Sequence, residues 1–504
     1  METFLWNNQQ LPVLQIVVPL LAAPLCLLIN HRWYNWLFTL AVSSFSFFVA
    51  ALLLLQVSQE GAEPISYYLG GWLPPYGIEI RIDQLNAFVL MLITAMSTVV
   101  LLSAHTSLEN KIEIAPDKNT YLYVAYLLCL AGLVGILLTG DAFNLFVFLE
   151  VSSLATYTLI ALGRDRRALW ATFQYLVMGT IGATFILIGI GLLYMKTGTL
   201  NMADLAQRLP ELSESRTIFV AFCFFIVGVC LKIALFPLHF WLPNAYAYAP
   251  TVVTAFLAAS ATKVALYIVI RFVFFVFGVE FSFTIIPLEK VFVILGTLGI
   301  IIASLVAIKQ QNIKRMLAYS SVAQIGYMVL GVSLSTAAGL MAGLLHLFNH
   351  ALMKGALFLA LGSILYRIGG VTLRHMQGVG KTMPFTMAAF LVGGLSIIGV
   401  PLTVGFVSKW YLLQAMLAEG WYVVSIIILI GSLLSVIYIW KIVEVAYFKP
   451  ALPNNANVKE SPLSLLIPIW ILVAANIYFG IDTRLPVALT EQISIQLFQG
   501  VAIP

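Results

Sequence analysis

Ionisable side chains inside apolar stretches constrain this chain more than any other feature of its sequence. Only 9% of the 504 residues are Asp, Glu, Lys or Arg, so each charge within such a stretch is a large share of what the chain keeps. An ionised group at the centre of a bilayer costs at least about 2.5–3.5 kcal/mol. A membrane chain that keeps several such groups therefore pairs them with one another, or moves ions or protons through them. The candidates are Glu150, Lys232, Lys263, His346, His350, Lys354 and Lys409.

The overall composition excludes a soluble domain. Hydrophobic residues make up 61% of the chain, and its mean hydropathy is +1.00. A helix needs roughly 20 apolar residues to cross a bilayer, and the sequence offers about fourteen such stretches. Alternating half-polar strands are absent, and backbone groups in lipid must bond internally, so we expect the spans to be helices. Spans 1 to 14 are expected at residues 11–30, 35–57, 85–105, 120–139, 142–163, 168–195, 217–236, 251–277, 285–307, 315–334, 338–366, 384–417, 422–446 and 463–482.

The segments between the spans are too short to hold a soluble core. Residues 1–504 are therefore expected to form a single all-α polytopic membrane domain, with its working parts inside the membrane. The four cysteines fall inside spans and show neither metal-ligand nor disulfide-framework spacing. The net charge of +5 comes from short loops and does not indicate a nucleic-acid partner. No metal site, cofactor or catalytic residue is predicted.

The distribution of Lys and Arg between the loops predicts the orientation. Alternate loops are rich in basic residues, and such loops stay in the cytoplasm. With an even number of spans, both termini are then expected outside. The outer loop 196–216 carries three basic and three acidic residues and looks amphipathic, so we expect a helix lying on the membrane surface. The basic loops include Arg164, Arg166 and Arg167; Lys309, Lys314 and Arg315; and Arg367, Arg374 and Lys381.

Prolines break two of the spans. Pro237 follows Lys232 in span 7, and Pro401 precedes Lys409 in span 12. A proline removes a helical hydrogen bond, which frees carbonyls that can hold water or cations. The offset of five spans predicts two inverted five-helix repeats, spans 4–8 and 9–13, although two unrelated proline kinks are an alternative. The expected parts are 1–119 (spans 1–3), 120–277 (first repeat), 285–446 (second repeat) and 463–504 (span 14 and the tail).

Glu150 and Lys232 are the natural partners among these charges. Glu150 lies near the middle of span 5, and Lys232 lies in the middle of span 7. Burial penalises the charge of either group, and an opposite charge nearby relieves that penalty. With Glu150 close, Lys232 is expected to hold its proton; with Glu150 drawn away, Lys232 can release it. The alternative is a purely structural ion pair.

Four further residues are expected to carry protons along the membrane plane. Lys263 lies in the middle of span 8, too deep to reach the surface easily. His346, His350 and Lys354 are spaced four residues apart on span 11, so they form one stripe, called here the span-11 stripe. Three titratable groups in line favour a proton relay, because histidine titrates near neutral pH. Two histidines without further ligands do not make a metal site.

Lys409 is the counterpart of Lys232 at the second break. It lies two turns past Pro401, on the far side of the break. The alternative is a lysine that snorkels to the outer surface. Asp83, Asp141 and His239 are weaker candidates. The two aspartates lie near span ends, where an ionised carboxylate costs little free energy. We expect at most an entrance or gating role for these three.

These residues together resemble the antiporter-like subunits shared by respiratory complex I, membrane-bound hydrogenases and multisubunit (Mrp-type) cation/proton antiporters. The resemblance covers spans 2 to 14. It implies a proton path from Glu150 and Lys232 through Lys263 and the span-11 stripe to Lys409. Its marks are Phe148-Leu-Glu150; Lys232 with Phe236-Pro237-Leu-His239-Phe-Trp241-Leu-Pro243; Lys263; Lys314-Arg-Met-Leu-Ala-Tyr-Ser-Ser-Val-Ala-Gln-Ile-Gly326; His346, His350 and Lys354; and Gly405-Phe with Lys409.

Within that family the chain is most similar to the D subunit of the Mrp-type sodium/proton antiporter. The segments 68–78 and 138–146 carry this likeness. Asn244 and Tyr246 stand where complex I subunits usually have an aspartate and a histidine. The resemblance implies a transporter subunit, not an enzyme, in the bacterial cytoplasmic (inner) membrane. It also implies partners among other membrane subunits, and an exchange of inward protons for outward Na⁺.

Two other interpretations are compatible with the sequence. Hydrogenase-type complexes contain a very similar subunit, so a proton-pumping subunit of a redox-driven complex is the main alternative. A membrane scaffold with structural ion pairs is another, and it would tolerate neutral, volume-matched replacements at Lys232. The sequence does not identify the exchanged cation, because it shows no oxygen-rich cluster that marks a sodium site.

Overall fold

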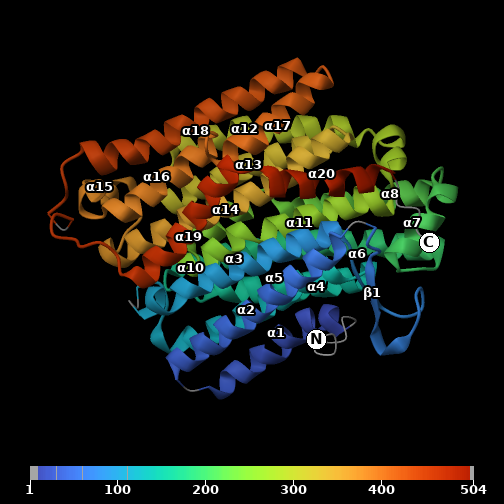
Figure 1. Ribbon diagram of the computed structural model, residues 1–504, viewed down its shortest axis with the longest axis horizontal. Helices are drawn as coiled ribbons and strands as arrows, with labels where there is room; N and C mark the ends of the chain where they lie inside the picture. The colour runs from blue at the N-terminus through green and yellow to red at the C-terminus, as the bar shows by residue number, and fades with distance from the viewer. Residues whose placement is uncertain (1–9, 30, 60, 110–111, 454, 500–504) are drawn as a thin grey trace.

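The computed structural model is a bundle of helices, and it describes residues 10–29, 31–59, 61–109, 112–453 and 455–499. Most of the helices lie side by side along the long axis of the view in Figure 1. Within the described ranges, thirteen helices are long and apolar enough to cross a membrane. The chain is therefore an all-α, multi-pass membrane protein, as the sequence predicts.

The predicted spans appear in order, with boundaries that agree within a few residues except in span 7, which was expected at 217–236 but continues beyond its break as a second helix that ends at Tyr248. Span 12 is a pair of shorter helices, and counting that pair as one adds a span to the thirteen. The helices of spans 1 to 14 are α1 with η2 (Leu11–Leu25, Cys26–Leu28), α2 (Arg32–Val57), α3 (Gln84–Glu109), α4 (Asn119–Leu138), α5 (Ala142–Ala161), α6 (Arg166–Thr197), α8 with α9 (Arg216–Ile233, Trp241–Tyr248), α10 with α11 and η6 (Thr251–Ala259, Ala261–Ile270, Arg271–Val276), α12 (Leu288–Lys309), α13 (Ile313–Ser333), α14 (Ala337–Ile368), α16 with α17 (Pro384–Ile398, Val404–Ala418), α18 (Tyr422–Phe448) and α19 (Leu463–Ile481).

Short elements connect the spans. The predicted amphipathic helix in loop 196–216 is α7 (Met202–Arg208), which buries Met202 and Leu205. Hydropathy alone does not predict the antiparallel hairpin of β1 (Ile65–Tyr68) and β2 (Glu79–Ile82), or the helix α20 (Arg484–Gln499) that packs on α14 and α3. The remaining elements are η3 (Leu69–Gly71), η4 (Pro116–Lys118), η5 (Pro210–Leu212), η7 (Glu280–Ile285), η8 (Leu373–Met376) and α15 (Val379–Thr382).

Three spans are interrupted, one more than the prolines predict. In span 7 the helix stops at Ile233 and resumes at Trp241. In span 12, Gly399 and Leu402 take positive φ angles between α16 and α17. The third break lies in span 8 at Ser260, whose φ of −122° and ψ of −62° are not helical. Because span 8 contains no proline, the sequence pattern does not reveal this break.

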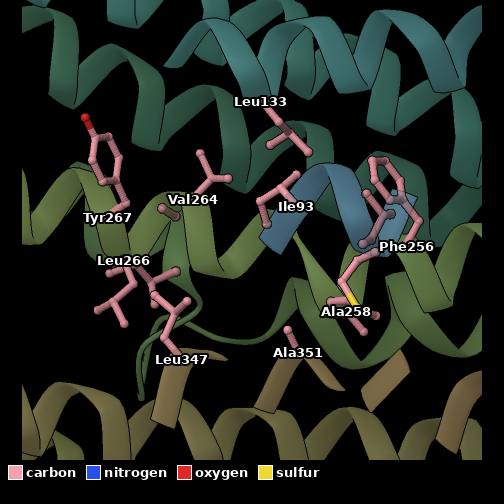
Figure 2. Packing of buried hydrophobic residues seen from close by; sticks show 14 of the residues in the cluster. Ile93, Leu133, Phe256, Ala258, Val264, Leu266, Tyr267, Leu347 and Ala351 are labelled. Carbon is pink, nitrogen blue, oxygen red and sulfur yellow. The ribbon is translucent and has the colours of Figure 1, made fainter. Parts of the chain in front are cut away.

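Span 8 lies at the centre of the bundle. Its apolar side chains, among them Phe256, Val264 and Leu266, pack between α3 and α4 on one side and α14 on the other (Figure 2). Small residues allow such close approach elsewhere too: a Cβ on Gly228 of α8 would collide with the carbonyl oxygen of Gly182 on α6. Polar side chains in the middle of span 8 are therefore enclosed by protein rather than lipid.

The two halves of the chain pack in the same succession. α4 lies on α5 and α5 on α6, as α12 lies on α13 and α13 on α14. The inverted relation between the halves stays a prediction, as do the part boundaries at 1–119, 120–277, 285–446 and 463–504. The terminal residues 1–9 and 500–504 lie outside the described residues, so the expected outer position of both termini also stays a prediction.

Candidate functional site

Glu150 and Lys232 meet between spans 5 and 7. Lys232 lies in the last turn of α8, directly before the break, and its Nζ is 3.5 Å from Glu150 Oε1. The same ammonium donates a 2.8 Å hydrogen bond to Ser153 Oγ. Lys232 is buried, whereas 27% of the Glu150 side chain is exposed. Strong charged hydrogen bonds are shorter, about 2.7–2.9 Å, so this pair is in contact but loosely held.

Lys263 is wholly buried in span 8, just after the break at Ser260. Its ammonium donates a hydrogen bond to the backbone carbonyl oxygen of Ala258, which lies on the other side of the break. Thr262 Oγ1 is 3.4 Å from the same nitrogen. The break in span 8 thus brings the carbonyl oxygen of Ala258 to the ammonium of Lys263, for which the sequence suggested no partner.

The span-11 stripe faces the protein interior. His346 is held from two sides, because its Nδ1 is 2.8 Å from Ser408 Oγ on α17 and its Nε2 is 2.9 Å from Gln324 Oε1 on α13. The ring of Tyr327 lies against it, with 5.6 Å between ring centroids. One hydroxyl and one amide therefore fix this imidazole between spans 10 and 12.

His350 and Lys354 continue the stripe at full burial. The rings of His346 and His350 are nearly parallel, with centroids 6.3 Å apart. Neither ring nitrogen of His350 has a hydrogen-bond partner among the described residues. Lys354 donates a 2.7 Å hydrogen bond to the carbonyl oxygen of Leu317, and another to Ser320, both on α13.

Lys409 is buried at the second predicted break and does not snorkel to the surface. Its Nζ donates hydrogen bonds to the carbonyl oxygens of Ile397, at 2.7 Å, and Ile398, at 3.1 Å, where α16 ends. It also bonds Ser432 Oγ at 3.0 Å and lies 4.8 Å from the ring centroid of Tyr327. The broken helix therefore holds a cation with its own carbonyls, as expected from the sequence.

The structure brings the stripe and two of the lysines together as one buried group. Lys263 is close enough to interact electrostatically with His346, His350 and Lys354. Lys409 follows Ser408, the hydroxyl partner of His346. Among the described residues, no carboxylate forms an ion pair with Lys263, Lys354 or Lys409. Lys232 lies on α8, which packs on α11, the helix of Lys263.

The weaker candidates lie apart from this group. Asp83 forms an ion pair with Arg271 at 2.7 Å. Asp141 caps α5, because its Oδ1 accepts a hydrogen bond from the backbone N–H of Asn144 at 2.7 Å; burial raises the pKa of Asp141. His239 lies within the break in span 7 and packs among aromatic rings.

Sequence reasoning missed two ion pairs at the ends of span 8. One is Asp83 with Arg271; the other is Glu113 with Lys314, at 2.9 Å. Glu113 also accepts a 2.9 Å hydrogen bond from the N–H of Thr251, where α10 begins. A signal for Arg271 was present, because it is a charge inside predicted span 8. Glu113 gave no such signal, since it lies in a loop and not inside an apolar span.

The described residues contain no group of three or more His, Cys, Asp or Glu side chains that could hold a metal ion. The four cysteines are free thiols within the helices. The candidate residues carry amines, imidazoles and one carboxylate, which are groups that can bind and release protons.

Known proteins resemble the chain over nearly its whole length. A family model described as NADH:quinone oxidoreductase/Mrp antiporter, transmembrane, matches residues 139–435. The N subunit of the NADH-quinone oxidoreductase of Desulforudis audaxviator is 40% identical over 485 residues, which cover 94% of this chain and 95% of the relative. The D subunit of the Na(+)/H(+) antiporter of Bacillus subtilis is 30% identical over 477 residues, 94% of each chain.

A solved structure supports the same assignment. One chain of the Mrp complex from a Dietzia species superposes with a TM-score of 0.89 at 26% sequence identity, and the match covers 98% of both chains. The relatives thus include an antiporter subunit and an oxidoreductase subunit. The chain belongs to the NADH:quinone oxidoreductase/Mrp antiporter transmembrane family.

Proposed function

We propose that this chain is the proton-translocating subunit of a multisubunit monovalent cation (Na⁺)/proton antiporter in the bacterial cytoplasmic membrane. The observation that carries the proposal is the buried row of amines and imidazoles between the broken spans 7 and 12. Protons move along this row. The row consists of Lys232, Lys263, His346, His350, Lys354 and Lys409, and the partly exposed carboxylate of Glu150 contacts Lys232.

Carbonyl dipoles and hydroxyls, rather than counter-ions, stabilise positive charge along most of the row. Lys263, Lys354 and Lys409 each donate to a backbone carbonyl oxygen. Burying a charge without an opposite charge is costly, and like charges in a low dielectric repel strongly. The row can therefore hold few extra protons at once. A proton that enters at one end favours release at the other.

The Glu150–Lys232 pair controls entry to the row. At 3.5 Å the carboxylate favours a charged Lys232. Because Glu150 is partly exposed, its carboxylate can move toward water and leave Lys232 without a counter-charge. Among the described residues, Lys232 then keeps only the neutral hydroxyl of Ser153 as a partner, so it gives up its proton more readily. The direction of this release is toward Lys263 on the neighbouring helix.

Water is required between the members of the stripe. His350 is fully buried, yet its two ring nitrogens have no partner among the described residues. Buried polar atoms in proteins almost always find a partner, and ordered water commonly supplies it. The 6.3 Å between the rings of His346 and His350 is also too long for direct transfer. We therefore place bridging waters beside His350.

The relatives support an antiporter as the surrounding complex. The Bacillus subtilis relative is named as part of a Na(+)/H(+) antiporter, and the Dietzia chain comes from an Mrp complex. By this analogy the chain works with other membrane subunits and exchanges protons for Na⁺. From the basic-loop rule we further propose that the loops carrying Arg164 and Arg374 lie in the cytoplasm and that both termini lie outside.

A second candidate is a proton-pumping subunit of a redox-driven complex. The specific observation in its favour is the 40% identity to the N subunit of an oxidoreductase. The same row of residues would serve either complex, because neither the amines nor the imidazoles carry electrons. The difference lies in the partner subunits, which supply either a cation path or a redox reaction.

The complex purified through a tag on this chain distinguishes these functions. In sealed proteoliposomes, an imposed Na⁺ gradient should drive proton movement that a pH-sensitive dye reports. Lys232→Ala should remove this signal, whereas Lys449→Ala, at an exposed loop lysine, should leave it intact. Proton movement that needs an electron donor instead of a gradient would assign the redox-driven function. Full activity of Lys232→Ala would reject both proton-translocating functions and would favour the interpretation of the chain as a membrane scaffold.

A further inference from the structure

A cavity of about 400 Å³ opens at the end of span 8 that carries Arg271. It lies at the opposite end of the span from Thr251 and the basic residue Lys314, so by the loop charges it is on the outer side. We call it the outer cavity. Its walls come from the β-hairpin, α7, η6 and α20, and the residues that matter here are Glu63, Arg81, Asp83, Ala206, Arg271 and Phe498.

The floor of the outer cavity is the ion pair of Asp83 and Arg271. Arg271 Nη1 is 2.7 Å from Asp83 Oδ2, and its Nη2 donates a 2.8 Å hydrogen bond to Oδ1. Burial alone would raise the pKa of Asp83, but the charge and hydrogen bonds of Arg271 hold that pKa below its usual value. The carboxylate is therefore ionised at neutral pH, as its ion pair with Arg271 requires.

Tyr267 connects this ion pair to the interior of span 8. Arg271 Nε donates a 3.2 Å hydrogen bond to the Tyr267 hydroxyl, which donates in turn to the carbonyl oxygen of Leu137 at 3.1 Å. A second, narrow cavity shares Asp83 and Arg271 with the first and is also lined by Tyr267. Figure 2 shows the Tyr267 ring pointing from span 8 toward the side of α4.

Lys263, Tyr267 and Arg271 recur every four residues. Consecutive members are therefore about one helical turn, roughly 6 Å, apart along span 8. One water molecule can bridge a gap of that size between polar groups. The spacing repeats that of the span-11 stripe, but it runs from the outer cavity to the middle of the membrane.

We propose that the outer cavity is the outer mouth of a proton branch that runs past the Asp83–Arg271 ion pair and through the Tyr267 hydroxyl to Lys263. This inference rests on the proposed proton relay and adds an entrance to it. The ligand of the cavity is water that carries protons.

The proton step leaves the tyrosine unchanged. The Tyr267 hydroxyl takes one proton from water on the cavity side and releases its own proton to water on the side of Lys263. No charge remains on the ring, and Asp83 balances the charge of Arg271 throughout. Phenylalanine at position 267 keeps the ring but has no hydroxyl to exchange.

Tyr267→Phe in the reconstituted complex tests the hydroxyl. Removing one positioned proton donor should slow proton movement by at least about tenfold. The matched control is Tyr126→Phe, which also removes a buried hydroxyl that donates to a carbonyl oxygen, that of Ser97, away from the cavity. Equal rates for the two variants would overturn the role of Tyr267.

Blocking the outer cavity with a bulky reagent tests whether protons enter there, and it leaves the relay residues unchanged. Cysteine at Ala206, which lines the outer cavity, should react with a bulky, impermeant thiol reagent from outside and thereby slow proton movement. Cysteine at Glu214, exposed in the same loop, should react without effect. If labelled Ala206→Cys works at full rate while Lys232→Ala is inactive, the outer mouth is rejected and the relay stands. If Lys232→Ala is active, the relay itself fails.

Discussion

Lys409 Nζ donates a 2.7 Å hydrogen bond to the carbonyl oxygen of Ile397, the last turn of the helix before the break in span 12. Lys263 makes the same kind of bond to the carbonyl of Ala258 across the break in span 8. Broken helices are tolerated inside membranes where something satisfies the freed backbone groups. Here the lysine ammonium does so, and each break in turn stabilises a cation that has no carboxylate partner among the described residues. The breaks and the buried lysines therefore depend on each other.

The contact between Glu150 and Lys232 predicts that neither can be neutralised without loss of transport. Glu150→Gln and Lys232→Ala should each reduce proton movement in proteoliposomes to the background of empty vesicles. Assembly should survive, because Glu150 is partly exposed and Lys232→Ala leaves its carboxylate access to water. Assembly is measured by the recovery of the tagged complex. Near-normal exchange by Lys232→Ala would contradict the coupled pair.

His350 is predicted to matter for transport more than for folding. Leucine has a similar bulk but cannot bind water, so His350→Leu should lower the transport rate by at least about tenfold while the complex still assembles. His105→Leu, at a partly exposed histidine near the end of span 3, serves as the control. High-resolution density should show ordered water beside the His350 ring. If the His350→Leu complex transports protons at the full rate, the span-11 stripe has no role in proton transfer and its residues serve only in packing.

The spans and two of the breaks could be predicted from sequence, because both follow from local properties. Twenty apolar residues specify a span whatever their neighbours are, and the breaks at Pro237 and Pro401 follow from a missing N–H group. The break at Ser260 could not be predicted, since it lies among alanines without a proline. The helix α20 escaped notice because its polar residues keep it below the hydropathy of a span.

The ionisable residues of the candidate site were visible, but their partners were not. A charge in an apolar span is conspicuous, so Lys263 and Lys354 could be named from the sequence. Ser153, Ser320 and Ser408 could not, because serine is common in membrane helices and only tertiary packing selects which ones face an ammonium or imidazole. The enclosure of a charged side chain likewise depends on neighbouring helices.

Gly405 is predicted to be essential for closing the break in span 12. A Cβ at this position would collide with the carbonyl oxygen of Ser396 on α16. Gly405→Ala should therefore destabilise the complex, by about 1–3 kcal/mol for an overpacked site, and lower its thermal unfolding midpoint. Gly191→Ala is the control, because a Cβ there meets open space on α6 and removes the flexibility of glycine. Equal midpoints for the two variants would contradict the tight contact.

The orientation of the chain can be tested at two loops that meet in space. Arg164, Arg167 and His375 line one cavity of about 270 Å³, so the loops after spans 5 and 11 lie at the same end of the bundle. Single cysteines at the exposed Arg166 and Arg374 must therefore react from one and the same side.

The basic-loop rule makes that side the cytoplasm. The background carries Cys223→Ser, since the other three cysteines are buried. In right-side-out vesicles an impermeant reagent should then label Glu214→Cys but neither Arg166→Cys nor Arg374→Cys, and inverted vesicles should give the opposite pattern. Labelling of Arg166→Cys from outside would show that the orientation is the reverse of the predicted one and that the outer cavity faces the cytoplasm.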